Sequence, residues 1–185
     1  PDKRVALFDV DYSFAGKNVM LRGVTTSAEA KAALLNGLSK ADYQVMDCLQ
    51  VLPDEAALEG KTYGIINVSV SNLRVDPDFS SEMMTQGLMG MPVRVLQHDG
   101  WYRIQTPDNY IAWVHRVGIH PVTKEELHVW NTAEKIVVTS HYGFVYSEPN
   151  QASQTVSDVV AGNRLKWEGT KGAFYKVAYP DGRTG

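Results

Sequence analysis

The stretch Tyr63-Gly-Ile-Ile-Asn-Val-Ser-Val-Ser-Asn-Leu-Arg-Val-Asp-Pro77 decides the fold, together with Gly100-Trp-Tyr-Arg-Ile-Gln-Thr-Pro-Asp-Asn-Tyr-Ile-Ala-Trp-Val114. Apolar and polar residues alternate in short runs, as at Ile66, Val68 and Val70. Turn-forming residues such as Asp76-Pro77 and Pro107-Asp108 close the runs. Alternation with period two is typical of half-buried strands, and closely spaced turns join such strands into compact sheets. The stretch therefore predicts a small barrel of antiparallel strands.

The same pattern returns between Lys135 and Gly185. Phe174-Tyr-Lys-Val-Ala-Tyr-Pro-Asp-Gly182 matches Trp101-Tyr-Arg-Ile-Gln-Thr-Pro-Asp-Asn109, and Pro149 precedes Gly162 by the interval that separates Pro77 from Gly90. Agreement in spacing, residue type and order indicates an internal repeat. The chain is therefore predicted to be mainly β, with tandem barrels over residues 61–118 and 134–185.

Residues 1–60 have a different pattern, which predicts a small α+β domain with the element order ββαβ. Thr26-Ser-Ala-Glu29 has the form of a capping box, with a hydroxyl at the N-cap and a carboxylate three residues later. Strands are expected at Arg4–Val10, Asn18–Arg22 and Tyr43–Leu52, and a helix at Ala30–Leu38.

Residues 119–133 are expected to form a helical linker between the barrels. Thr123 and Glu126 occupy capping-box positions, and Val122, Leu127 and Trp130 supply an apolar face. The segment is not rich in glycine or serine, so we expect the barrels to be held in a fixed relation.

Composition excludes several classes of function. The net charge of -3, with both signs interspersed, argues against nucleic-acid binding, which needs a basic face. No apolar run approaches the roughly 20 residues of a transmembrane helix. The single cysteine, Cys48, excludes an internal disulfide and lies in an apolar run that predicts a buried strand.

No catalytic or metal-binding pattern is present, so the chain is expected to be non-catalytic, without cofactor or metal. The five histidines have no metal-ligand spacing on a predictable element. An enzyme built on Cys48 or the histidines remains the least favoured alternative.

Aromatic residues are the candidate binding residues, because rigid rings with polar tips suit peptide or sugar recognition. Most aromatic residues in a small barrel serve packing, and Trp113 is expected in the core. The candidates are Trp101, Tyr102 and Tyr110 in the first barrel and Tyr142, Tyr146 and Tyr175 in the second.

At these residues the sequence resembles the tandem bacterial SH3 (SH3b) domains of NlpC/P60-type cell-wall cysteine peptidases, of the γ-D-glutamyl-L-diamino acid endopeptidase or dipeptidyl-peptidase VI kind. The resemblance is carried by Val70–Pro77, Ser81–Leu96 and Trp101–Val114, and more loosely by the second copy. In this family a catalytic domain follows the second barrel. The resemblance implies an exported protein of the periplasm or cell envelope, and places Tyr102 or Tyr110 near the bound peptide's amine.

Two functions follow as expectations. The favoured one is a non-catalytic module that binds peptidoglycan stem peptides and targets a peptidase domain; the alternative is an envelope scaffold whose barrels bind a protein partner. The sequence stops at Gly182-Arg-Thr-Gly185, where a last strand is due. The second barrel is therefore expected to lack one strand, whether in a fragment of a longer enzyme or in a shortened relative.

Overall fold

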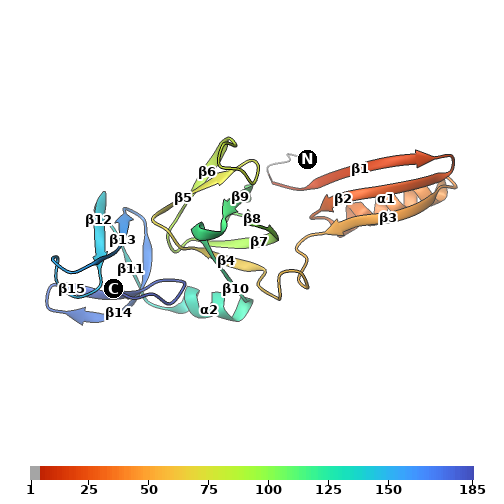
Figure 1. Cartoon of the computed structure of the whole chain (residues 1–185). Coiled ribbons are helices and arrows are strands. Elements are labelled where there is room, and N and C mark those ends of the chain that lie inside the picture. Colours follow the sequence, from red (N-terminus) through yellow and green to blue (C-terminus); the bar gives the residue numbers. More distant parts are fainter. Residues whose placement is uncertain (1–4) are drawn as a thin grey trace.

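The computed structural model describes residues 5–185 and shows three units in a row (Figure 1). The chain is mainly β, as predicted. Among residues 5–185, none of the helices is long and apolar enough to cross a membrane.

The N-terminal unit is a three-stranded sheet with one helix. It contains β1 (Phe8–Ala15), β2 (Asn18–Thr25), α1 (Ala28–Lys40) and β3 (Gln44–Val51), in the sheet order β1-β2-β3. β1 pairs with β2 antiparallel, whereas β3 runs parallel to β2 because α1 carries the chain back across the sheet. Val19, Leu21 and Leu49 are buried, and Leu34, Leu35 and Leu38 of the helix pack on them.

Two local expectations for this unit are wrong. The first strand begins at Phe8 rather than at Arg4, which lies outside the described residues. The N-cap of α1 is Ser27, whose Oγ accepts a hydrogen bond from the Ala30 N–H at 3.1 Å. Thr26 is not the cap because its Oγ1 accepts a hydrogen bond from the Leu7 N–H at 3.2 Å, which ties the start of the chain to the end of β2.

The next unit, which we call the first unit, is a seven-stranded sheet with the order β10-β4-β7-β8-β9-β5-β6. Its elements are β4 (Tyr63–Ile66), β5 (Val70–Arg74), β6 (Met83–Leu88), β7 (Pro92–Asp99), β8 (Trp101–Gln105), β9 (Ile111–His115), a 3₁₀ turn (Arg116–Gly118) and β10 (Ile119–Val122). The core combines residues from these strands. Five of them are 0% exposed: Ile66, Leu73, Val95, Ile104 and Val114. The alternation at Val93 and Val95 therefore marks the buried face, whereas the run Ile66, Val68 and Val70 does not: β4 ends at Ile66, and Val70 is 36% exposed.

The expected closed barrel is not formed. No backbone ladder joins β6 to β10 within residues 5–185, and β5 meets β9 only at the pair Arg74–Trp113. A register shift between Leu73 and Arg74 bends β5 at this point, as β-bulges do. Residues 119–122, expected in a linker, instead form β10 and pair with β4.

The connection to the second unit is α2 (Lys124–Thr132), and its predicted capping box is confirmed. The Thr123 Oγ1 accepts from the Glu126 N–H at 3.2 Å, and the Glu126 Oε2 accepts from the Thr123 N–H at 2.8 Å. Trp130 is buried with Ile65 and Val122, and its indole Nε1–H donates to the Gly90 carbonyl at 3.2 Å. The helix therefore lies fixed against the first unit.

The second unit repeats the strand order but is divided into two sheets. β11 (Lys135–Val137), β14 (Arg164–Lys171) and β15 (Phe174–Ala178) form one, and β12 (Tyr142–Tyr146) and β13 (Thr155–Val160) form the other. In the first unit, β9 joins β8 to β5. No strand of the described chain takes that place between β15 and β12, so the two sheets stay separate.

Direct contacts join the two units. Met89 of the first unit is 1% exposed and belongs to the core of the second, with Val159, Leu165 and Val177. Its carbonyl accepts a hydrogen bond from the Arg164 N–H at 3.0 Å. Side-chain bonds add to this contact: Asn67 Nδ2 to Asp181 Oδ2 at 2.8 Å, Ser69 Oγ to Asp158 Oδ2 at 2.7 Å, and Asn163 Nδ2 to the Ser69 carbonyl at 2.8 Å. These contacts agree with the expected fixed relation.

Candidate functional site

The hairpin of β8 and β9 places two half-buried aromatic rings on the outside of the first unit. Because side chains alternate along a strand, Trp101 and Arg103 face away from the core that holds Ile104. Trp101 lies opposite His115 in the register, and their ring centroids are 5.0 Å apart. The site begins with this cross-strand pair.

The loop between β5 and β6 adds Phe79 to the pair. The Phe79 ring lies 4.8 Å from Trp101 and 4.9 Å from His115, centroid to centroid, and its side chain is 66% exposed. We call Phe79, Trp101 and His115 the aromatic cluster. A loop phenylalanine with such exposure is positioned by ring contacts while most of its surface stays open to solvent, which suits ligand contact.

A cation continues this face beside the cluster. The Arg103 guanidinium lies 5.3 Å from the centroid of the Trp113 ring, which is mostly buried. Its buried Nε has no hydrogen-bond partner among residues 5–185. Burial lowers the pKa of Arg103, while the nearby carboxylates of Asp9 and Asp76 raise it. The face therefore combines exposed rings with charges of both signs.

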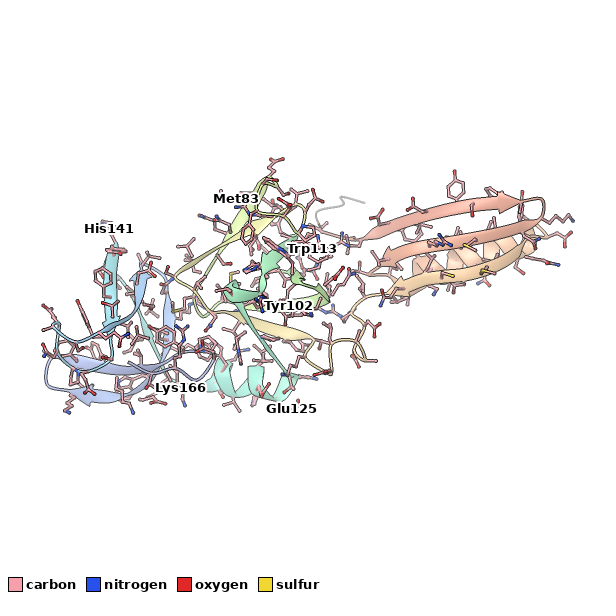
Figure 2. All side chains as sticks on the ribbon, in the orientation of Figure 1. Met83, Tyr102, Trp113, Glu125, His141 and Lys166 are labelled. Carbon is pink, nitrogen blue, oxygen red and sulfur yellow. The ribbon has the colours of Figure 1, made fainter. Side chains whose placement is uncertain are left out.

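The N-terminal unit covers the other end of the same hairpin face. Leu7 and Leu52 form a buried cluster with Leu96 and Ile111. Gln105 Nε2 donates to the Val5 carbonyl at 3.3 Å. Trp113 lies on this side of the first unit (Figure 2). The N-terminal unit thus borders the candidate site at the end of the hairpin opposite to the aromatic cluster.

The three candidates of the first unit do not lie together. Trp101 belongs to the aromatic cluster, whereas Tyr102 points to the opposite face of β8, where it packs against the core and stacks on His98 with ring centroids 4.2 Å apart. Burial raises the pKa of the Tyr102 hydroxyl. Tyr110 is half-buried at the far end of the hairpin, and its N–H donates to Thr106 Oγ1 at 3.0 Å.

Sequence reasoning missed Phe79 and His115 as site residues. His115 could have been found, because pairing β8 with β9 about the Pro107-Asp108-Asn109 turn places it opposite Trp101. Phe79 carries no such signal, since a loop has no periodicity from which its direction could be read.

The candidates of the second unit fall on two surfaces. Tyr142, Phe144 and Tyr146 alternate along one face of β12, with neighbouring ring centroids 5.0 and 6.4 Å apart. Tyr146 and Tyr175 line an apolar groove of about 510 Å³, whereas Tyr142 is not among its lining residues.

Cys48 is exposed, so the expectation that it is buried is wrong. β3 is a strand as predicted, but α1 covers only one face of its sheet. Leu49 faces the helix and is buried, and Asp47 on the same side forms an ion pair with Lys31 at 2.8 Å. Cys48 lies between them in sequence and therefore on the open face.

Comparison with known proteins identifies the segment that holds the aromatic cluster. Residues 73–118 match the family model described as the bacterial dipeptidyl-peptidase SH3 domain. No curated protein matches the chain.

Two solved structures share the fold. An NlpC/P60 family protein from Bacillus cereus ATCC 10987 matches with a TM-score of 0.53 and 20% identity, over 66% of this chain and 52% of its own. An NlpC/P60 endopeptidase from Photobacterium damselae subsp. piscicida matches with a TM-score of 0.50 and 11% identity, over 87% of this chain and 36% of its own. This chain spans about half the length of the first protein.

Both identities are low, so these likenesses concern the fold alone. Residues 73–118 are therefore related to the SH3 domains of bacterial dipeptidyl-peptidases, and the proteins of similar fold belong to the NlpC/P60 family.

Proposed function

We propose that this chain is a non-catalytic cell-wall-binding module that recognises peptidoglycan stem peptides through the aromatic cluster of its first SH3-like unit. The observation that carries the proposal is the contact of the exposed Phe79 with the half-buried Trp101 and His115, within the segment matched to a dipeptidyl-peptidase SH3 domain. Rigid rings bind with little loss of conformational entropy, so an exposed group of them favours recognition over packing.

The charges beside the cluster suit the chemistry of a stem peptide. Such a peptide carries carboxylates and a free amine, and the face offers the Arg103 guanidinium together with the carboxylate of Asp76. The Arg103 guanidinium lies over the Trp113 ring and is partly buried, so its attraction to a carboxylate is less screened than in bulk water. Tyr102 and Tyr110, which point elsewhere, contribute less than Trp101 on this proposal.

The module would position a catalytic peptidase domain on its substrate in an exported protein of the periplasm or cell envelope. The similarity of fold to an NlpC/P60 endopeptidase supports this role. Residues 1–60 would act as a separate domain bordering the site, and the units at 61–118 and 134–185 as tandem SH3-like domains.

The proposal can be tested by titrating the tripeptide L-Ala-γ-D-Glu-diaminopimelate into the full chain and monitoring the titration by NMR. We expect saturable shifts at the Trp101 indole N–H and at the Phe79 amide. The variants Trp101→Ala and Phe79→Ala should each weaken binding about tenfold, which corresponds to ~1.4 kcal/mol. Tyr142→Ala removes a ring of the second unit that is 59% exposed, close to the 66% of Phe79; it is the matched control and should bind normally. A tripeptide that shifts no resonance of the aromatic cluster would refute the proposal.

The alternative is an envelope scaffold that binds a protein partner, and the apolar groove of the second unit favours it. If the tripeptide does not bind, we expect instead that a protein partner binds at this groove.

A further inference from the structure

The outward face of β8 leads from the aromatic cluster to the N-terminal unit, with Arg103 between them. Trp101, Arg103 and Gln105 alternate on this face, and neighbouring side chains on one face of a strand are about 7 Å apart. Trp101 belongs to the aromatic cluster. Gln105 lies at the end bordered by the N-terminal unit, where its Nε2 donates to the Val5 carbonyl.

The Arg103 guanidinium is held by its neighbours but keeps hydrogen-bonding capacity. It lies 5.3 Å from the centroid of the Trp113 ring, and Trp113 is its partner in the β8–β9 ladder. Its Nε is buried and has no hydrogen-bond partner within residues 5–185, while the residue as a whole is only half-buried. A guanidinium presents its N–H donors as a rigid planar fork that matches the two oxygens of a carboxylate. Arg103 is therefore suited to bind a carboxylate of a ligand.

A carboxylate from the N-terminal unit lies on the far side of Arg103 from the rings. Asp9 of β1 pairs with Val24, and Val24 packs against the buried cluster that joins the N-terminal unit to the first unit. Residues directly opposite each other in an antiparallel pair lie on the same face of the sheet, so Asp9 also faces the first unit.

Asp76 of the β5–β6 loop is a second carboxylate beside Arg103. It follows Arg74 by two residues, and Arg74 pairs with Trp113 in β9. Burial lowers the pKa of Arg103, and the carboxylates of Asp9 and Asp76 raise it, so both lie within electrostatic reach of the guanidinium. Both aspartates are exposed, which leaves them accessible to a ligand.

We propose that Arg103 and Asp9 select which stem peptide is bound, by recognising a carboxylate and an ammonium carried on one carbon atom of the ligand. The inference rests on the proposed function, because it concerns the same face. In a stem peptide this group is the far end of diaminopimelate, which is an amino-acid zwitterion. Lysine in the same place ends in an ammonium alone. The module therefore prefers diaminopimelate peptides.

The order of chemical groups along β8 matches the order along this ligand. The methylene chain of diaminopimelate is apolar and suits contact with the rings of Phe79 and Trp101. Its distal carboxylate then meets Arg103, and its distal ammonium lies toward Asp9. The step of about 7 Å from one side chain to the next on this face is comparable to the length of an extended diamino-acid side chain.

The test compares two tripeptides on the full chain by calorimetry, with NMR to locate binding. L-Ala-γ-D-Glu-meso-diaminopimelate and L-Ala-γ-D-Glu-L-lysine differ only in the distal carboxylate. The parent should bind the first about tenfold more tightly, because only the first forms charge-assisted hydrogen bonds with Arg103. Arg103→Met should remove this preference without weakening the lysine peptide. A purely structural role of Arg103 would weaken both peptides alike.

Asp9→Asn tests the part assigned to the N-terminal unit. It should weaken both tripeptides about threefold, because both end in an ammonium and Asp76 remains. A tripeptide with Nε-acetyllysine lacks the ammonium, so its binding should not respond to this substitution. Asp11→Asn is the matched control, since Asp11 lies on the same face of β1, one step farther along the strand and opposite Arg22. It should bind both peptides as the parent does.

The outcomes separate this inference from the proposed function. Equal binding of the two tripeptides by the parent, or a preference that persists in Arg103→Met, overturns the inference, while shifts at Trp101 and Phe79 would still uphold the proposed function. Equal effects of Asp9→Asn and Asp11→Asn would show that Asp9 has no such role. If neither tripeptide binds, the proposed function is wrong and this inference with it.

Discussion

Met89 is the side chain whose removal should reveal how the first and second units are held together. It is 1% exposed and belongs to the core of the second unit although it follows β6 of the first. Truncating a buried methionine to alanine removes apolar contacts and leaves a cavity, which costs about 2–5 kcal/mol. Its carbonyl still accepts from the Arg164 N–H, because the substitution leaves the backbone unchanged. We therefore expect Met89→Ala to cost about 3 kcal/mol.

The loss should be concentrated in the second unit. Its two sheets are not joined by a strand, so Met89 provides a large share of the contacts that hold its core. Amide hydrogen exchange reports stability residue by residue and separates the units, which a single melting curve cannot do. We expect amide protection to fall at Leu165 and Val177, and to change little at Ile104 in the first core.

Met83→Ala is the matched control. Met83 lies at the exposed end of β6 and is 49% exposed (Figure 2), so its truncation should change stability by at most about 0.5 kcal/mol. If Met89→Ala is as mild as Met83→Ala, or if protection falls equally in both units, Met89 does not couple the two cores and the reasoning is wrong.

Three further predictions concern single positions. Gly90→Ala should destabilise by about 2 kcal/mol or more, because Gly90 has φ +84° and a Cβ would meet the Arg164 carbonyl oxygen at 2.3 Å; Gly172→Ala, with φ +60° and open space, should cost only about 1 kcal/mol in the same thermal melts. Burial raises the pKa of Asp181, but hydrogen bonds from Asn67 and Arg183 outweigh burial and lower it below the unfolded value. The stability it contributes is therefore present above the unfolded pKa and lost as pH falls through the folded pKa; urea unfolding between pH 6 and 3 should show this loss, and Asp181→Asn should reduce it. Cys48 should react with iodoacetamide in the native protein about as fast as in the unfolded protein, and slow labelling would contradict its exposure.

Features that depend on neighbours in the chain could be predicted from the sequence. The alternation at Val93 and Val95 places Val95 in the core at 0% exposure, and the capping box at Thr123 and Glu126 forms as predicted. Both signals arise within a few residues, where the geometry of a strand or of a helix start dictates which side chains meet. The relation of residues 73–118 to bacterial SH3 domains follows from such motifs as well.

Features that join distant segments were decided by the tertiary structure. Cys48 is exposed because α1 covers one face of the sheet and nothing in the described chain covers the other. Phe79 joins Trp101 because the β5–β6 loop folds over the β8–β9 hairpin. Met89 enters the core of the second unit because the turn after β6 faces it.

The sequence by itself determined that the chain is mainly β, that Val93 and Val95 lie on a buried face, and where the helix cap at Thr123 forms. Only the tertiary structure decided the composition of the aromatic cluster, the coupling of the two cores and the open groove. The physical reason is that periodicity records which face of an element is apolar, whereas the partner of that face depends on register and on the path of the chain. The contact of Phe79 with Trp101 shows this most clearly, since no local pattern in the β5–β6 loop indicates that it folds over the β8–β9 hairpin.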